Sequence, residues 1–578
     1  MLIVLSLAPL WLVGIFGRGL WTPDEPREAD IAWRMSLQSD HTLPQLAGRP
    51  FLEKPPLTYW MSAGALALWG DSAAAARVPN ALYAVTAAVT IGALALAMHE
   101  DIGAAVIAAL VAMSALTAFR ASIWLAPDSC LLAGCALALL GAWRGYRAAP
   151  GPRKAAGYTL MHLGAAIGFM AKSAPGWLVP ALALLTLIAW ERRWSELRRW
   201  ELYAGLALQV LLIGPWLLAV ARSAQGADAL RALFWHNVVG RFTRVAATAE
   251  LDYTSGHRNF PGKYLLELPL YLLPWTLIVA AALVRAWQRV REPGPAGTPW
   301  RFALAASLPF LALLSLAATA RDVYAAPAML GFGLLSGLWV HDMRGESSGI
   351  EELALRCSRW LVTAMAWALA GALTIVAVAG AGPPLACAAA AAGVLAAAQL
   401  AMLRGARAQQ ADEVQRSVGW TYAGYAAALT LAALAALPVI DRWQDLAALA
   451  RRIHADTARD SLALLDADET TIAILDRGLD TPFTLLSSGT DATRPAAADG
   501  ARHAVDAWLA AHGRDARVLV LLPGHAPGKL SRWLERLHRS APPGDGVAGR
   551  LVACGVAALV QRYELPQGRR YALLGPPP

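Results

Sequence analysis

The sequence has few cysteines and few charged residues, and each shortage excludes a class of protein. Its five cysteines are scattered through 578 residues, with no CxxC pair and no metal-ligand spacing, which argues against a disulfide framework. Only 16% of the residues are charged, against about 25% in soluble domains, whereas 57% are hydrophobic. No internal repeat is visible. This composition predicts a protein embedded in a membrane.

Apolar runs of about twenty residues, the length that crosses a bilayer, recur along the chain. They predict a multi-span α-helical membrane protein with about 13 transmembrane helices. The runs are 2–20, 78–98, 102–119, 126–143, 157–173, 175–190, 203–221, 264–284, 302–319, 324–341, 360–380, 384–403 and 419–438. The first run lacks a basic leading segment and a persuasive cleavage site, so we expect a retained span rather than a signal peptide.

The net charge of +9 has two interpretations, nucleic-acid binding or basic loops between spans. The positions of the basic residues favour loops, because eighteen Lys and Arg lie in five short connections. These connections are 144–156, 191–201, 285–301, 342–359 and 404–418. Cytoplasmic loops are enriched in Lys and Arg. The pattern therefore predicts that loops 21–77 and 222–263, and everything after 438, lie on the outer side.

The composition changes after Pro438, because no apolar run of spanning length follows. We therefore expect a transmembrane domain at 1–438 and a second domain at 439–578. In the second domain, strand-like stretches such as Thr471–Leu475 and Val518–Leu522 alternate with helix-like ones such as Ala501–His512. This alternation predicts a small soluble α/β domain outside the membrane, whose charged residues form an ordinary surface.

A dense group of acids and bases follows the first span. It begins with Pro23-Asp24-Glu25-Pro26-Arg27 and closes on Phe51-Leu52-Glu53-Lys54-Pro55-Pro56. Ionisable residues at other outer span ends join it, namely Asp128, Lys172, His236, Arg241, Arg321 and Tyr324. Lys and Arg hold phosphates, and a carboxylate among them can act as a base or orient a reactant. We therefore expect a phosphate-handling site at the outer membrane face, although a single Lys at a span end is often only an anchor.

The two motifs of the first loop, followed by Tyr59-Trp60, resemble the first outer loop of the ArnT-like aminoarabinose transferases. These are GT-C glycosyltransferases related to protein O-mannosyltransferases. The resemblance extends to Ala126-Pro127-Asp128, Lys172, Leu273-Pro274-Trp275 and the segment from Phe234 to Phe242, and covers roughly residues 1–340 by motif. After Arg27 the family usually carries an aromatic residue, where this chain has Glu28.

The resemblance implies an inverting glycosyltransferase of the bacterial inner membrane. It implies transfer of a sugar, such as 4-amino-4-deoxy-L-arabinose, from undecaprenyl phosphate to lipid A or another envelope acceptor at the periplasmic face. Asp24 is then the catalytic carboxylate, positioning groups for a phosphate acceptor or acting as a true base for a hydroxyl. The expected substrate-binding and phosphate-binding residues are Arg27, Glu53, Lys54, Asp128, Lys172, His236, Arg241, Arg321 and Tyr324. No metal or cofactor is expected beyond the lipid-linked donor, since Glu53 with His236 is a weak metal pair.

Three alternatives stay open at this point. The first, within the same superfamily, is a protein O-glycosyltransferase or O-mannosyltransferase. The second is a transporter or flippase, although the charged cluster lies in an outer loop rather than at broken midplane helices. The third makes 441–578 the working part and the spans an anchor, for which thirteen spans are excessive.

Overall fold

The computed structural model describes most of the chain. It omits residues 52, 240–258, 293, 318–320, 344–346, 459–460, 480–481, 488–494 and 524–545, and the side chains of 236–239 and 495–498. The predicted site residue Arg241 and the side chain of His236 therefore lie outside the described part.

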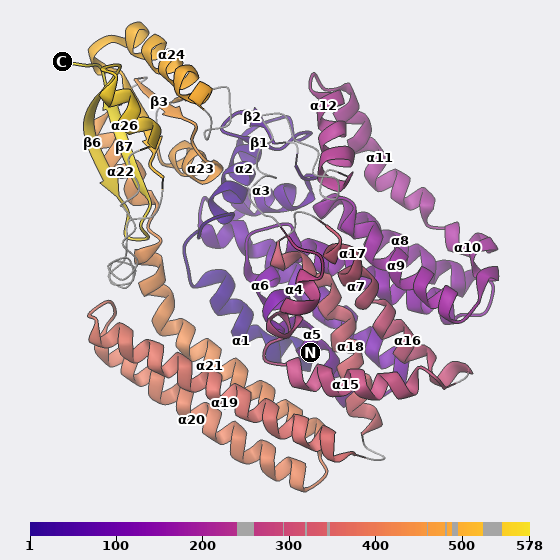
Figure 1. Cartoon of the computed structure of the whole chain (residues 1–578). Helices are drawn as coiled ribbons and strands as arrows, with labels where there is room; N and C mark the ends of the chain where they lie inside the picture. Colours follow the sequence, from indigo (N-terminus) through magenta and orange to yellow (C-terminus); the bar gives the residue numbers. More distant parts are fainter. Residues whose placement is uncertain are drawn as a thin grey trace.

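Helices dominate the chain from Leu2 to Trp443 (Figure 1). The first half contains α1 (Leu2–Phe16), α2 (Glu25–Leu37), α3 (Leu57–Trp69), α4 (Ala73–His99), α5 (Ile102–Ser114), α6 (Leu116–Ile123), α7 (Asp128–Arg147), α8 (Pro152–Lys172), α9 (Pro175–Trp190), η1 (Trp194–Arg198), α10 (Trp200–Tyr203), α11 (Leu206–Arg222), α12 (Gly226–Arg231) and η2 (Ala232–Val239). The second half contains α14 (Lys263–Tyr271), α15 (Thr276–Arg289), η4 (Gly294–Ala296), α16 (Thr298–Ala305), α17 (Leu308–Ser315), η5 (Asp322–Ala325), α18 (Ala326–Asp342), α19 (Gly349–Val378), α20 (Pro384–Gln410) and α21 (Val414–Trp443). A short antiparallel ribbon, β1 (Gln45–Leu46) with β2 (Arg49–Pro50), lies between α2 and α3.

The chain is an integral membrane protein. Among the described residues, seven helices are long and apolar enough to cross a membrane, or nine if each of two bent pairs is one span. The bent pairs are α5 with α6, at 71°, and α14 with α15, at 119°. Every predicted apolar run meets a helix or a broken helix, but α1 already ends at Phe16 and run 302–319 divides into α16 and α17. The count of thirteen spans stays a prediction.

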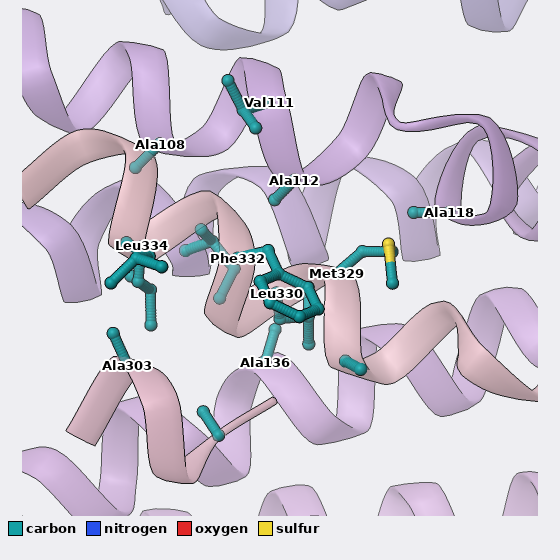
Figure 2. Close-up of a cluster of buried hydrophobic side chains, with 14 of the residues drawn as sticks. Ala108, Val111, Ala112, Ala118, Ala136, Ala303, Met329, Leu330, Phe332 and Leu334 are labelled. Atoms are coloured by element: carbon teal, nitrogen blue, oxygen red, sulfur yellow. The ribbon is translucent and has the colours of Figure 1, made fainter. Parts of the chain in front are cut away.

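The helical part packs through small residues. Figure 2 shows α18 beside α5, with Ala108 and Ala112 on the side that faces Phe332 and Leu334. A Cβ at Gly333 would lie 2.5 Å from the Ala108 carbonyl oxygen, and one at Gly337 would lie 2.8 Å from the Ala108 Cβ. Glycines four residues apart let two helix backbones approach closely within a membrane. This close packing holds α18, and the η5 turn before it, at a fixed place.

A five-stranded sheet forms the C-terminal unit, which we define as Ala447–Gly575. Its strands are β3 (Leu462–Leu465), β4 (Thr484–Leu486), β5 (Arg517–Leu521), β6 (Ala558–Glu564) and β7 (Arg570–Gly575), in the order β4-β3-β5-β7-β6. Strands β4, β3 and β5 are parallel to one another, and β7 is antiparallel to both of its neighbours, β5 and β6. The other elements are α22 (Ala447–Asp456), α23 (Glu469–Gly478), α24 (Pro495–His512), η6 (Gly513–Asp515) and α26 (Gly546–Ala553).

Side chains that alternate along β3 and β5 build a core on each face of this sheet. Helices α24 and α26 cover one face, and α22 and α23 cover the other. The predicted strand Thr471–Leu475 is wrong, because these residues lie in α23. Asp468 accepts a hydrogen bond from the Thr471 backbone nitrogen and caps that helix. Figure 1 shows α23 beside α2, the helix that carries the first charged motif.

Candidate active site

The first turn of α2 places Asp24 at the centre of a group of cations. Asp24 is the residue before the helix, and Pro26 occupies its first turn, a position that proline favours. The Asp24 Oδ1 atom accepts hydrogen bonds from Arg321 Nη1 at 2.6 Å and from Arg27 Nη2 at 3.3 Å. Arg321 is 297 residues away in sequence, and η5 brings it to this helix end.

These cations keep Asp24 ionised. Burial opposes ionisation of this carboxyl, but the charges of Arg27, Arg321 and Lys54 outweigh it and lower the pKa of Asp24 to about 2. An efficient general base has a pKa near the working pH. Asp24 is therefore a fixed negative charge in the free protein, suited to orienting groups and to stabilising positive charge that develops in a reaction.

Glu28 joins the two sequence motifs and was missed by sequence reasoning. Its Oε1 accepts from Lys54 Nζ at 2.6 Å and from Arg27 Nη2 at 2.7 Å, and its Oε2 accepts from the Tyr59 hydroxyl at 2.7 Å. The Phe51 ring lies beside both cations, 5.3 Å from the Arg27 guanidinium carbon and 5.8 Å from Lys54 Nζ. Glu28 is almost fully buried. The sequence held one indication of its importance, since an acid stands at this position where the family carries an aromatic residue.

A second cluster lies where α7 begins and α8 ends. These helices form an antiparallel hairpin, so Asp128 at the start of α7 meets Lys172 at the end of α8, and Lys172 donates a hydrogen bond to Asp128. Lys172 Nζ also lies 4.1 Å from the centre of the Tyr324 ring. Tyr324 follows Arg321 by one turn, and its backbone nitrogen donates to the Arg321 carbonyl oxygen. The η5 turn thus connects this cluster to Asp24.

Among the remaining predicted residues, Glu53 is described by the structure. Glu53 is half-buried, and its charge acts on Arg27, whose pKa is raised by Glu28, Glu469, Glu53 and Asp24 against the opposing effect of burial. His236, as a side chain, and Arg241 lie outside the described residues. Within the described part of the chain, no three His, Cys, Asp or Glu side chains gather at a spacing that could hold a metal ion.

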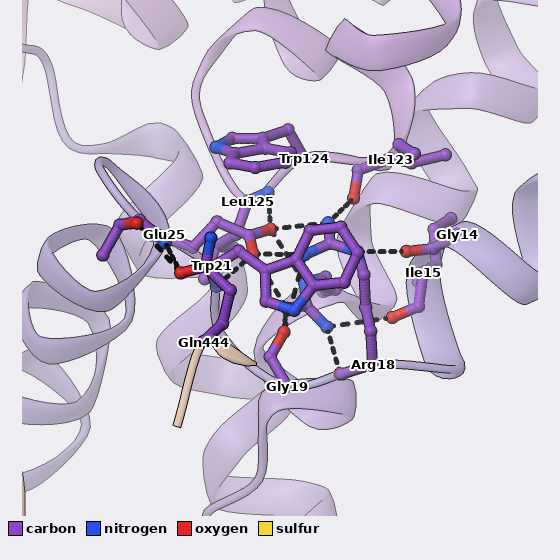
Figure 3. Close-up of polar contacts among 12 residues, drawn as sticks. Gly14, Ile15, Arg18, Gly19, Trp21, Glu25, Ile123, Trp124, Leu125 and Gln444 are labelled. Atoms are coloured by element: carbon purple, nitrogen blue, oxygen red, sulfur yellow. Dashed lines mark hydrogen bonds and ion pairs between the residues drawn. The ribbon is translucent and has the colours of Figure 1, made fainter. Parts of the chain in front are cut away.

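Glu25, the neighbour of Asp24, belongs to a separate buried network (Figure 3). Its carboxylate accepts from Arg18 at 2.8 Å, from Arg77 at 3.0 Å and from the Leu125 backbone nitrogen at 2.8 Å. The Arg18 guanidinium also lies over the Trp21 and Trp124 rings. Glu25 therefore ties the ends of α1, α4 and α6 together beneath the site.

The C-terminal unit contacts this region through charged residues of α23. Glu469 accepts a hydrogen bond from Arg27, Asp476 accepts two from Arg34, and Arg477 pairs with Asp71. The prediction that the charged residues of 441–578 form an ordinary surface is therefore wrong for these three. They face the first loop because α23 packs along α2.

Asp30 provides a test of this contact. Its carboxyl is fully buried in α2; burial and the nearby Asp476 raise its pKa to about 9, with Arg34 opposing. A raised pKa means that the folded state holds the proton, so stability falls as the pH rises from the ordinary 3.8 towards 9, by about 1.4 kcal/mol for each pH unit. Asp30→Asn copies the protonated acid. We expect the unfolding temperature of Asp30→Asn in detergent to exceed that of wild type by a larger margin at pH 8 than near pH 5. Equal loss of stability in both proteins between these pH values would contradict this account.

Comparisons with known proteins give the class of this fold. The structure superposes on that of ArnT from Cupriavidus metallidurans bound to undecaprenyl phosphate, with a TM-score of 0.70 and 19% sequence identity. The superposition covers 99% of this chain and 97% of that one. The oligosaccharyltransferase of Archaeoglobus fulgidus is more distant, with a TM-score of 0.50, 11% identity and coverage of 90% of this chain and 68% of that one. This chain therefore has the fold of ArnT from Cupriavidus metallidurans.

Sequence comparisons show which families of transferase this chain is similar to. Residues 53–218 match the family described as dolichyl-phosphate-mannose-protein mannosyltransferase. An undecaprenyl phosphate-alpha-4-amino-4-deoxy-L-arabinose arabinosyl transferase from Pseudomonas paraeruginosa is 31% identical over 358 residues, covering 61% of each protein. A transferase of the same name from Edwardsiella ictaluri is 29% identical and 58% of each protein is covered. The matches thus span about three fifths of the relatives' lengths, and they confirm the resemblance to the ArnT-like family.

Proposed function

We propose that this protein is an inverting glycosyltransferase that uses a polyprenyl-phosphate sugar. The donor is a sugar, such as 4-amino-4-deoxy-L-arabinose, on undecaprenyl phosphate, and the acceptor is lipid A or another envelope glycolipid. The observation that carries this proposal is the Asp24 carboxylate held between Arg27 and Arg321, beside Lys54. Fixed cations around a carboxylate suit the departure of a phosphate from a sugar carbon.

The residues divide into two roles in this proposal. Asp24 is the catalytic carboxylate, and Arg27, Lys54, Lys172 and Arg321 hold phosphates of the carrier or acceptor. The bond between the sugar anomeric carbon and the carrier phosphate breaks, and a bond to the acceptor oxygen forms on the opposite face. The lowered pKa of Asp24 supports an acceptor that is already an anion, such as a lipid A phosphate, because no proton then has to be removed. Glu53, Asp128 and Tyr324 bind the sugar and the phosphates in this proposal, and the sequence motifs assign the same role to His236 and Arg241.

The proposal also assigns a place in the cell. The protein lies in the bacterial inner membrane with about 13 spans in a domain at 1–438. The site and a soluble domain at 439–578 then face the periplasm. The excess of Lys and Arg in the five opposite loops supports this orientation.

Mass spectrometry of membranes tests the proposal. The full-length protein is expressed in cells that make the lipid-linked aminoarabinose donor. Lipid A and total envelope glycolipids of these cells are compared with those of cells that make the donor but lack the protein. The expected result is a lipid A mass increased by one sugar residue for each modified phosphate. An increment on proteins instead would support the related protein glycosyltransferases and overturn the assigned acceptor. No increment on any acceptor, with the protein present and donor available, would overturn the transferase assignment.

A further inference from the structure

The first turn of α23 reaches the centre of the candidate active site. Glu469, its first residue, accepts a hydrogen bond from Arg27 Nη1, and the Thr470 hydroxyl donates to the Pro23 carbonyl oxygen at 2.9 Å. Pro23 immediately precedes Asp24, and Arg27 follows it by one helical turn. Two contacts from the C-terminal unit therefore hold the segment on either side of the catalytic carboxylate.

The surroundings of Arg27 show what Glu469 adds. On one side, Glu28 accepts from Arg27 Nε at 3.2 Å and from Nη2 at 2.7 Å. Asp24 is held more loosely, at 3.3 Å from Nη2. Glu469 binds the other terminal nitrogen, and it is the most accessible of the three carboxylates, with 30% of its side chain exposed. Because a guanidinium is planar, fixing both of its terminal nitrogens fixes the direction in which its donors point.

We infer that Glu469 is a positioning residue for Arg27, so that the C-terminal unit completes the active site rather than only covering it. This inference rests on the proposed function. Without Glu469, only Glu28 and Asp24 accept from Arg27, through its Nε and Nη2 atoms, and the guanidinium can turn away from Asp24. The phosphate of a lipid-linked donor would then meet a misdirected cation, and a displacement of about 1 Å at a reacting centre can cost about 100-fold in rate.

The rest of α23 provides a matched control. Arg477, at the far end of this helix, pairs with Asp71, which is about half exposed. Asp71→Asn therefore removes a charged contact between the same two parts of the protein without touching Arg27. Asp476, next to Arg477, still pairs with Arg34 in both variants and holds the far end of the helix. A loss of activity caused only by weaker attachment of the C-terminal unit should therefore appear both in the Glu469 variants and in Asp71→Asn.

The experiment compares Glu469→Ala, Glu469→Asp and Asp71→Asn in the purified full-length protein. Sugar transfer from the polyprenyl-phosphate donor is measured together with binding of undecaprenyl phosphate and thermal unfolding. For Glu469→Ala we expect kcat/KM to fall by up to about 100-fold, with weaker undecaprenyl phosphate binding and little change in unfolding temperature. Glu469→Asp should recover part of the loss, because it keeps the charge, and Asp71→Asn should behave like wild type.

Other outcomes would overturn the inference in distinct ways. Unchanged transfer and binding in Glu469→Ala would remove Glu469 from the site. Tighter binding of undecaprenyl phosphate would show that Glu469 competes with phosphate for Arg27. Equal losses in Asp71→Asn, or a fall in unfolding temperature that accounts for the lost activity, would show a docking role alone. A wild-type protein that neither transfers sugar nor binds undecaprenyl phosphate would overturn the proposed function itself, and this inference with it.

Discussion

An Asp24→Asn variant should fold normally and lose sugar transfer by about 10²- to 10⁴-fold. Asparagine keeps the shape of the side chain and can still accept from Arg321, but it removes the negative charge between Arg27 and Arg321. Transfer kinetics with the lipid-linked donor measure the loss. Asp322→Asn is the matched control, because Asp322 follows Arg321 directly, is half exposed, and pairs with Arg120 rather than with the site.

The pH profile adds a second test of Asp24. Since the pKa of Asp24 is lowered to about 2, the carboxylate is ionised throughout the range in which the protein is stable. We therefore expect kcat/KM, which reports groups of the free enzyme, to show no acidic limb from Asp24 between pH 4 and 8. A limb near pH 6 that disappears in Asp24→Asn would show that Asp24 acts as a base, and would favour a hydroxyl acceptor over a phosphate.

Glu25→Ala, one residue away, should act on stability instead of chemistry. It leaves the buried cations Arg18 and Arg77 without their shared carboxylate, a change that costs about 3–5 kcal/mol in comparable buried pairs. The yield of folded protein and the unfolding temperature in detergent should both fall sharply. Glu413→Ala is the control, since it breaks an exposed pair with Arg416 whose contribution is small.

Unchanged unfolding in Glu25→Ala would contradict the structural role described for this residue. So would a folded, stable variant with no activity, which would place Glu25 in the reaction. The two neighbouring acids of one motif are thus separable by experiment, because α2 points one towards Arg321 and the other towards Arg18 and Arg77.

The sequence was most informative where local pattern determines position. Apolar runs predicted the helices, and motif spacing brought Asp24, Arg27 and Lys54 into one group. Glu28 carried a weaker signal: it departs from the family pattern, and a partly buried Lys54 needs a counter-ion. Nothing near Glu469 indicates its partner, because Arg27 lies 442 residues earlier and the contact depends on how α23 docks.

Dependence on distant parts of the chain also explains why the strand predicted at Thr471–Leu475 was wrong. Its β-branched and apolar residues suit a strand, but the Asp468 cap starts a helix whose apolar side packs on the sheet and on α2. Local propensity is a weak guide when capping and burial favour the other structure.

The pairing of Trp21 and Thr22 with the end of α21 has a consequence for biosynthesis. Asp441 accepts from the Trp21 indole nitrogen at 2.6 Å, and Gln444 accepts from the Thr22 hydroxyl at 2.9 Å. The first pair is separated by 420 residues, which a ribosome adds in roughly 20–80 s. Arg18, Glu25 and Arg77, by contrast, emerge close together in time and can neutralise one another early. The nascent chain can therefore shelter its buried charges early, whereas the segment that carries the proposed catalytic Asp24 is completed only as synthesis ends.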